Sequence, residues 1–352
     1  MTLGLVVGKF YPPHRGHRHL IETARRGCDR LVVMVPHHPS QTISGALRAA
    51  WLQEIHPDCE IHLVADELGD DVEEWARFTV GYLGRASDVV FSSEGYGPRF
   101  AGFLACRHVM VDRDRVAFPV SGTAIRAAPL DHLDWMEPCV RAYFVRRVVL
   151  IGAESTGKTT LARVLAARYQ TVWVEELGRE YWQAKLSAGA PLDGPSPAVA
   201  EERPSSVEAE AELAARAAAL AWTSDEFRHI AAEQQRRENE LARVANRVLL
   251  CDTNAFATGS WHERYVGHRD AAVDEIGRCD RVHLYLLAYP DVPFVQDGWR
   301  DGESVRDAMH ARFLGQLDAL AVPVVHLRGP LDARLADASA AIDALLATPF
   351  DR

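Results

Sequence analysis

Short apolar runs alternate with longer helical stretches along the whole chain, and this alternation constrains the fold more than any other feature. Strands that alternate with helices form βαβ units, and such units build parallel sheets. In the first half of the chain the expected strands are residues 3–8, 31–35, 61–64, 89–92 and 108–111. In the second half they are residues 148–151, 172–175, 248–251, 282–287 and 324–327. The sequence therefore predicts an α/β fold with a parallel sheet in each half.

The length of 352 residues suits two domains, each able to bury a core of its own. Pro138 and the arginine-rich segment 141–147 precede a new strand, and we place the boundary near Arg146. The predicted domains are residues 1–145 and 146–352. The helical patterns that support this plan are residues 16–27, 45–56 and 72–83, with a closing helix at 332–346.

One stretch, residues 187–221, differs in composition from the rest of the chain. It carries four prolines and then an Ala/Glu-rich run. The first part is typical of a flexible excursion and the second of a solvated helix. We therefore expect a flexible surface insertion that carries no catalytic residue.

Charge and cysteine content exclude several classes of protein. The 39 Lys and Arg against 49 Asp and Glu give a net charge of −10, which disfavours non-specific binding to nucleic acid. The six cysteines stand singly, so neither a zinc site nor a disulfide framework is indicated. No apolar run approaches the roughly 18 residues of a membrane span, and residues 3–8 are too short for a signal peptide. We expect a cytoplasmic protein with no membrane partner.

The segment that follows the first expected strand, residues 8–17, reads GKFYPPHRGH and opens a helix. A strand–loop–helix start is where α/β sheets bind ligands, and a helix N-terminus attracts anions. The glycines permit close backbone approach, the two histidines can aim at one phosphate chain, and the lysine adds charge. The nucleotide-site residues expected here are Gly8, Lys9, Phe10, His14, Gly16 and His17.

A second string, VSGTAIR at residues 120–126, lies near the end of the first domain. Ser121 and Thr123 can cap a helix whose N-terminus faces phosphate. Arg126 can bind phosphate oxygens as a planar fork. Read alone, this string is a common helix start, and together with residues 8–17 it indicates a phosphate site.

The most specific short signal is GAESTGKT at residues 152–159, which matches GxxxxGK[ST] between an expected strand and a helix. In such a P-loop, backbone N–H groups cradle the phosphates of ATP. Lys158 reaches the β- and γ-phosphates, and the Thr159 hydroxyl binds Mg²⁺. The residues expected to bind ATP are Gly152, Ser155, Thr156, Gly157, Lys158, Thr159 and Thr160.

A P-loop indicates a nucleoside triphosphate and leaves the second substrate open. Asp252 ends the third strand of this domain, where it is placed as a Walker-B-type Mg²⁺ partner. Glu176 follows the second strand and is a candidate to bind a ribose or take a proton. The sequence leaves the proton acceptor open between these two carboxylates. Residues 293–303 are typical of a mobile lid, with Arg300 for the transferring phosphate. Trp261 and Tyr265 are stacking candidates, although core packing is the simpler expectation.

These strings resemble a known family. GxFxPxHxGH is the signature of the nucleotidyltransferase superfamily with the HxGH motif, and residues 120–126 resemble its second signature. SSEGYG at residues 92–97 and the pattern of Ile43, Ser44, Gly45, Arg48, Trp51 and Leu52 resemble the adenylyltransferase domain of the bifunctional NadR family. The P-loop and the strings at residues 175–181, 222–235, 251–254 and 293–303 resemble the ribosylnicotinamide kinase domain of that family.

The resemblance implies a Rossmann-like nucleotidyltransferase domain followed by a P-loop kinase domain, both using ATP and Mg²⁺. The first domain would join nicotinamide mononucleotide to the adenylyl group of ATP, giving NAD and pyrophosphate. The second would phosphorylate nicotinamide riboside, and its product is the substrate of the first. Adenylyltransferases of this superfamily often assemble, so a homo-oligomer is an open expectation.

Three departures from the family pattern bear on function. The chain begins at the first strand, so we expect neither the helix-turn-helix of some family members nor a repressor function. The usual DTD appears as Asp252-Thr253-Asn254, and the lost charge at Asn254 is expected to weaken binding of Mg²⁺ or substrate. The stretch 187–221 lies beside the expected kinase substrate segment. Kinase activity is therefore less secure than adenylyl transfer.

Two other functions remain open. The first keeps both folds and changes the acceptor, as in a phosphopantetheine adenylyltransferase-like transfer beside an unrelated kinase. The second is a monofunctional adenylyltransferase whose P-loop domain is regulatory or altered in specificity.

Overall fold

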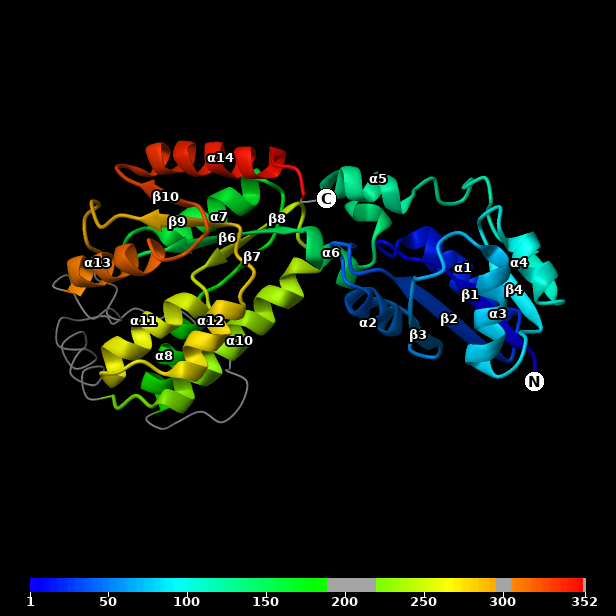
Figure 1. Cartoon of the computed structure of the whole chain (residues 1–352). Coiled ribbons are helices and arrows are strands. Elements are labelled where there is room, and N and C mark those ends of the chain that lie inside the picture. Colours follow the sequence, from blue (N-terminus) through cyan, green and yellow to red (C-terminus); the bar gives the residue numbers. More distant parts are fainter. Residues whose placement is uncertain (189–219, 296–304, 351–352) are drawn as a thin grey trace. The chain divides into compact units, whose positions relative to one another are not determined.

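The computed structural model describes residues 1–188, 220–295 and 305–350 (Figure 1). The chain divides into two compact units. The first comprises Met1–Phe144 together with the chain end from Pro349, and the second comprises Val145–Thr348. The predicted insertion at residues 187–221 lies almost wholly outside the described residues, as does Arg300.

The first unit is built on a five-stranded sheet in which every pair of neighbouring strands is parallel, in the order β3-β2-β1-β4-β5. The strands are β1 (Leu3–Val7), β2 (Arg30–His37), β3 (Glu60–Ala65), β4 (Val89–Ser92) and β5 (Arg107–Met110). The helices are α1 (Arg15–Arg26), α2 (Gly45–Ile55), α3 (Val72–Leu83), α4 (Gly97–Phe103), α5 (Gly122–Ala127) and α6 (Pro138–Phe144), with short 3-10 turns at Pro129–Asp131 and Leu133–Trp135.

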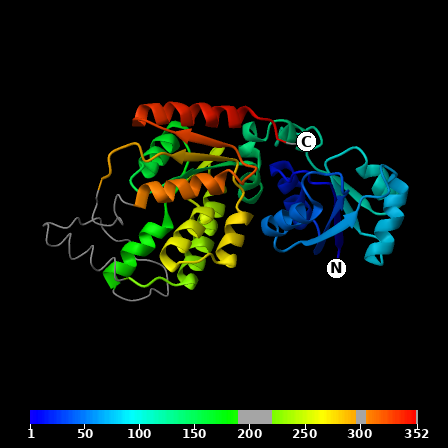
Figure 2. The same ribbon diagram turned by 60° about the vertical axis from the view of Figure 1, so that its left-hand side comes forward.

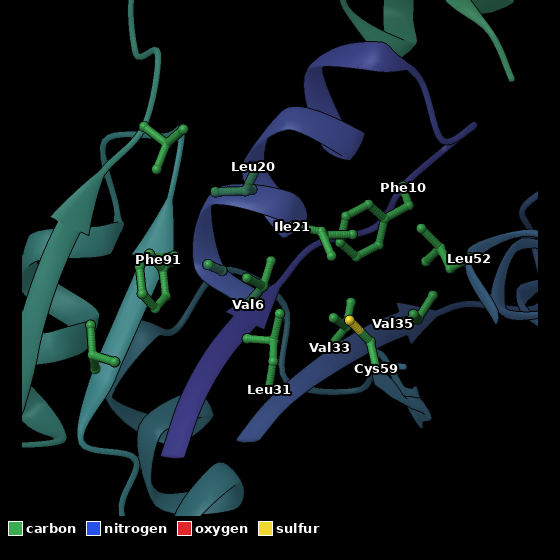
Figure 3. Close-up of a cluster of buried hydrophobic side chains, with 13 residues drawn as sticks. Val6, Phe10, Leu20, Ile21, Leu31, Val33, Val35, Leu52, Cys59 and Phe91 are labelled. Carbon is green, nitrogen blue, oxygen red and sulfur yellow. The ribbon is translucent and has the colours of Figure 1, made fainter. Parts of the chain in front are cut away.

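Both faces of this sheet are buried because the apolar strands alternate their side chains between two helix layers. On one face, Val6 and Val33 pack with Leu20 and Ile21 of α1 and Leu52 of α2 (Figure 3). The other face forms a second core with α3 and α4, and its members include Leu5, Val32, Met34, Ala76 and Phe100. Burial on both faces explains why the strands are almost continuously apolar.

The second unit repeats this plan with the strand order β10-β9-β6-β8-β7, again parallel throughout. The strands are β6 (Arg146–Ile151), β7 (Trp173–Val174), β8 (Val248–Asp252), β9 (Leu284–Ala288) and β10 (Val324–Leu327). The helices are α7 (Lys158–Arg168), α8 (Leu177–Ala188), α10 (Ser224–Ala242), α11 (Ala255–Val266), α12 (Ala271–Cys279), α13 (Arg306–Leu317) and α14 (Leu331–Ala347).

In this unit, α7 and α14 cover one face of the sheet. Leu161 and Leu165 of α7 and Ile342 of α14 pack there against Val148 and Leu250. Helices α10, α11 and α12 lie on the other side of the sheet (Figure 1), and Figure 2 shows the same layers after rotation, with α14 in red. The carboxyl ends of β6 and β8 therefore open between two helix layers.

The predicted fold class and all ten predicted strands are confirmed. The shortest strand is β7, which keeps only Trp173 and Val174 of the predicted residues 172–175. As a strand that pairs on one side only, with β8, β7 has fewer partners to extend it. Among the described residues, no helix combines the length and apolar character needed to cross a membrane.

Candidate functional site

The first candidate site opens at the carboxyl end of β1, the central strand, where the strand order of the sheet reverses. Open α/β sheets bind ligands at such a point. A cavity of about 580 Å³ lies there, lined by both sequence strings. It brings together every site residue expected in the first domain: Gly8, Lys9, Phe10, His14, Gly16, His17, Ser121, Thr123 and Arg126.

His14 and His17 form a stacked pair at the start of α1. Their ring centroids lie 3.6 Å apart with an angle of 24° between the planes. His14 caps the helix, and its Nδ1 accepts the backbone N–H of His17 at 3.4 Å. A neutral ring that accepts at Nδ1 carries its proton on Nε2. His14 therefore keeps one N–H for a ligand.

Both histidines are held neutral. Burial, with a smaller contribution from the charge of Arg115, lowers the pKa of His14 to about 4. Burial lowers the pKa of His17 well below its usual value, and His14 and Arg115 add to that effect. At pH 7 the pair offers hydrogen-bond donors rather than positive charges. Positive charge for a phosphate chain must come from the lysine and arginines of the cavity.

Lys9 and Arg126 are tied to the walls of the cavity. The ammonium of Lys9 pairs with the buried carboxylate of Asp66 at 2.9 Å. Arg126 donates to the backbone carbonyl of Tyr11 and to the Thr123 hydroxyl, and its guanidinium lies 4.4 Å from the centre of the Tyr11 ring. These contacts hold both cations beside the cavity.

The start of α5 is built for close approach. The Ser121 hydroxyl accepts the N–H of Ala124 at 3.1 Å and so caps the helix. A Cβ atom on Gly122 would lie 2.6 Å from the Tyr11 carbonyl oxygen, which is closer than a real Cβ approaches. Only glycine therefore lets α5 meet the loop that carries the histidines.

Phe10 lines the cavity as part of the hydrophobic core. Its side chain is 2% exposed and belongs to the core with Ile21 and Leu52 (Figure 3). Its ring meets His17 edge-on, with centroids 5.0 Å apart. Phe10 forms the floor of the cavity and sets the position of His17.

Sequence reasoning named Arg48 only as part of the family pattern and assigned no role to Asp66 or Arg115. Arg48 is fully buried and donates to the backbone carbonyls of Lys9, Pro36 and Ile43, so it fixes the loop beside β1. Asp66 and Arg115 line the cavity. An arginine inside the apolar pattern of residues 45–56 was the available signal for Arg48. For Asp66 and Arg115, the sequence carries no signal that separates them from surface charges.

The second candidate site is the P-loop between β6 and α7. Gly157 has a φ of +80° and precedes the helix, and a Cβ on Gly152 would lie 2.6 Å from the Ala288 carbonyl oxygen. Lys158 Nζ and the Thr156 hydroxyl both donate to the Ala153 carbonyl, at 2.9 and 2.8 Å. A cavity of about 320 Å³ is lined by Ser155, Thr156, Gly157, Lys158, Thr159 and Thr160. Gly152 lies outside that lining and shapes the loop from behind.

Thr159 and Asp252 meet where a P-loop protein holds Mg²⁺. The Thr159 hydroxyl donates to Asp252 Oδ2 at 2.5 Å, while Oδ1 is buried without a hydrogen-bond partner among the described residues. Burial raises the pKa of Asp252, and Lys158 and Thr159 oppose that rise. A buried carboxylate oxygen lacking a partner suits a hard cation. Within the described chain, no group of three or more His, Cys, Asp or Glu side chains is placed to hold a metal ion.

The rest of this cavity is aromatic and charged. Glu176 and Arg179 line one wall, and both have partners within the protein. The aromatic lining consists of Trp182, Trp222, Phe227, Trp261 and Tyr265. Trp261 and Tyr265 also pack against a core that includes Phe227, so they serve both as core and as cavity wall. Such a wall suits a flat ring, and a cationic ring most of all.

Asn254 is not placed at the Mg²⁺ site, contrary to the expectation from the sequence. It is fully buried and caps α11, with its Oδ1 accepting the N–H of Ala257 at 3.4 Å. Its Nδ2 donates to Asp280 at 3.1 Å and to the Tyr285 hydroxyl at 3.3 Å. The third position of the DTD pattern acts here as a helix cap.

Two arginines from distant parts of the chain hold the P-loop. Arg334 of α14 is buried and donates to the carbonyls of Thr156, Tyr289 and Gly329 at 2.7–2.9 Å, and it pairs with Asp291. Arg306 donates to the Ser155 carbonyl at 3.2 Å. Both approach from elements more than 140 residues along the chain, and motif spacing cannot show such contacts.

Each of the two units matches a different protein family. Residues 147–334 match the AAA domain family, and residues 5–128 match the Cytidylyltransferase-like family. Two curated relatives, each called trifunctional NAD biosynthesis/regulator protein NadR, are 26% identical to this chain. The Salmonella typhimurium protein matches over 93% of this chain and 79% of its own length, and the Escherichia coli protein over 86% and 73%.

The chain belongs to the AAA domain family and is a homologue of NadR. The resemblance to NadR drawn from the motifs is thereby confirmed.

Solved NadR structures share the fold. One, described as NadR protein in complex with NR, superposes with a TM-score of 0.71 at 18% identity and covers 100% of this chain and 98% of its own. Another, in complex with NAD and AMP-PNP, gives 0.68 at 18% identity with the same coverage. Known NadR proteins therefore share the fold of this chain.

Proposed function

We propose that this chain is a bifunctional enzyme of NAD biosynthesis. Its first unit would transfer the adenylyl group of ATP to nicotinamide mononucleotide, releasing pyrophosphate. Its second unit would transfer the γ-phosphoryl group of ATP to the 5′-hydroxyl of nicotinamide riboside. The observation that carries this proposal is the convergence of two separate sequence strings on one cavity in each unit. The NadR relatives supply the identity of the substrates.

Adenylyl transfer needs positioning and charge stabilisation rather than a protein nucleophile. A phosphate oxygen of the mononucleotide forms the new bond to the α-phosphorus of ATP, and the bond to pyrophosphate breaks. His14 and His17, both neutral, would hold phosphate oxygens through N–H groups. Lys9 and Arg126 would neutralise the charge that moves onto the leaving group. The N-terminus of α1 favours the same anion.

Phosphoryl transfer follows the same logic in the second unit. Lys158 and the loop amides would hold the β- and γ-phosphates. Thr159 and Asp252 would hold Mg²⁺, which would offset the negative charge of the phosphates when bound. Glu176 lines the cavity and would take the proton of the attacking hydroxyl, whereas Asp252 accepts a hydrogen bond from Thr159. The aromatic wall suits a pyridinium ring, which is flat and positively charged.

The acceptor of the first unit is tested by a substrate panel. The purified chain receives ATP and Mg²⁺ with nicotinamide mononucleotide or with phosphopantetheine, and adenylylated product and pyrophosphate are measured. We expect a dinucleotide and pyrophosphate only with the mononucleotide. Transfer to phosphopantetheine without transfer to the mononucleotide would contradict the proposal.

A matched pair of glycine variants ties the activity to the cavity. Gly122→Ala places a methyl group 2.6 Å from the Tyr11 carbonyl, so we expect it to displace the start of α5 and abolish dinucleotide formation. Gly102→Ala, on α4 of the same unit, meets nothing within 4 Å and should keep full activity. Equal activity in the two variants would place the reaction elsewhere.

A further inference from the structure

A loop outside both sequence strings, residues 8–17 and 120–126, forms part of the wall of the first cavity. It runs from Asp112 to Phe118, directly after β5. The Asp112 carboxylate accepts the backbone N–H groups of Val116, Ala117 and Phe118 at 2.9–3.3 Å. Phe118 stands near the start of α1, since its Cβ lies 3.6 Å from where a Cβ on Gly16 would be. The loop is therefore folded around its own carboxylate, beside the histidine pair.

Arg115 stands at the middle of this loop and lines the cavity together with Lys9, His14, His17 and Arg126. Its charge acts on both histidines, whose pKa values it helps to lower. A guanidinium that acts on two stacked rings faces the place where a phosphate chain would contact them.

The other two positively charged side chains that line this cavity are already engaged. Lys9 pairs with Asp66 at 2.9 Å, and Arg126 is held by the Tyr11 carbonyl and the Thr123 hydroxyl. The histidines are neutral. By contrast, no hydrogen bond or ion pair joins the Arg115 side chain to any residue in the described ranges. Arg115 can therefore bind an incoming anion without giving up a protein partner.

We propose that Arg115 is a catalytic residue that binds the phosphate chain of the nucleotide in the first unit. This inference rests on the proposed adenylyl transfer and adds a residue to it. The planar fork of the guanidinium binds two phosphate oxygens at once. As the bond from the α-phosphorus to pyrophosphate breaks, negative charge grows on the leaving group, and Arg115 stabilises it there. The proton count does not change, since arginine remains protonated throughout.

The loop supplies its own control. Arg113 lies two residues before Arg115, is exposed, and is absent from the cavity lining. Arg113→Gln and Arg115→Gln therefore make the same change of charge in the same loop. For each variant, kcat and KM for ATP are measured in dinucleotide formation from nicotinamide mononucleotide, together with inhibition by inorganic pyrophosphate.

We expect Arg115→Gln to lower kcat/KM by about tenfold to a hundredfold, the worth of one hydrogen bond to a charged group. Its inhibition by pyrophosphate should weaken as well. Arg115→Lys keeps the positive charge but loses the planar guanidinium, so its kcat/KM should lie between those of Arg115→Gln and the unchanged chain. Arg113→Gln should match the unchanged chain.

A measurement other than activity, the pKa of His14, distinguishes a direct role of the Arg115 charge from a purely structural effect of the substitution. Removing the charge of Arg115 should raise the pKa of His14, measured by NMR titration, whereas Arg113→Gln should leave it in place. Equal kinetics in the two glutamine variants, with active wild type, would overturn the role of Arg115. A wild-type chain that makes no dinucleotide would instead refute the proposed function, so the two failures are distinguishable.

Discussion

At the scale of single residues, the environment decides what a motif residue can do. His14 and His17 match a phosphate-binding string, yet burial makes them neutral donors rather than cations. Asn254 matches a position expected at a metal, yet it caps a helix. Phe10 matches the same string as the histidines and serves as core. Motif identity fixes the place of a residue along the chain, and packing fixes its chemistry.

The neutral state of His14 predicts a pH dependence of stability. Its folded pKa of about 4 lies below the unfolded value near 6.5, so the unfolded chain binds more protons between these two values. Stability should therefore fall as pH drops from about 6.5 to about 4, by about 3 kcal/mol from this group. NMR titration should give a midpoint near 4, and His14→Asn, which can still cap α1, should flatten the slope. A midpoint near 6.5 in the free protein would contradict this account.

The cap at Asn254 predicts the effect of two substitutions. Asn254→Ala removes the acceptor for the Ala257 N–H and should cost about 1 kcal/mol of unfolding free energy. Asn254→Asp restores the family pattern but turns a donor to Asp280 into a second carboxylate, so it should also destabilise the second unit. Denaturant unfolding and the Mg²⁺ dependence of ADP formation measure the two effects. If Asn254→Asp needed a lower Mg²⁺ concentration for half-maximal ADP formation, this position would contribute to Mg²⁺ binding, contrary to this account.

At the scale of elements, the sequence predicted much of the fold because both sheets are buried on two faces. Such strands must be apolar, so the strands of both units can be recognised in the sequence. The motifs in the loops that follow β1 and β6 consist largely of glycine and charged residues, so they can be recognised too. The contacts that hold those loops could not be predicted. Arg306 and Arg334 reach the P-loop from other elements, and their side chains look like ordinary surface charges in the sequence.

The position of α14 predicts a distant effect on the P-loop. Arg334→Met removes the donors to three backbone carbonyls and the partner of Asp291. The substitution should lower the free energy of unfolding by at least about 3 kcal/mol. It should also raise KM for ATP in phosphoryl transfer. Asp337→Asn, an exposed change on the same helix, should leave both unchanged. Thermal unfolding and ADP release measure the pair. Identical behaviour of the two variants would mean that Arg334 does not organise the loop.

At the scale of the whole molecule, the chain joins two parallel sheets, each with a cavity at the carboxyl end of its central strand. All residues argued to act in each reaction lie within one unit. The two proposed reactions should therefore be separable by substitution. The proposed product of the second unit would be the substrate of the first, so one starting compound would report on both.

The most direct test follows nicotinamide riboside with ATP and Mg²⁺ over time by chromatography, in the wild-type chain and two variants. Wild type should form the mononucleotide and ADP first, then NAD and pyrophosphate. Lys158→Ala should leave the riboside unchanged but still convert added mononucleotide to NAD. His17→Asn should stop at the mononucleotide. A wild-type chain that never phosphorylates the riboside, while still making NAD from the mononucleotide, would contradict the account of the second unit and leave a single adenylyltransferase activity.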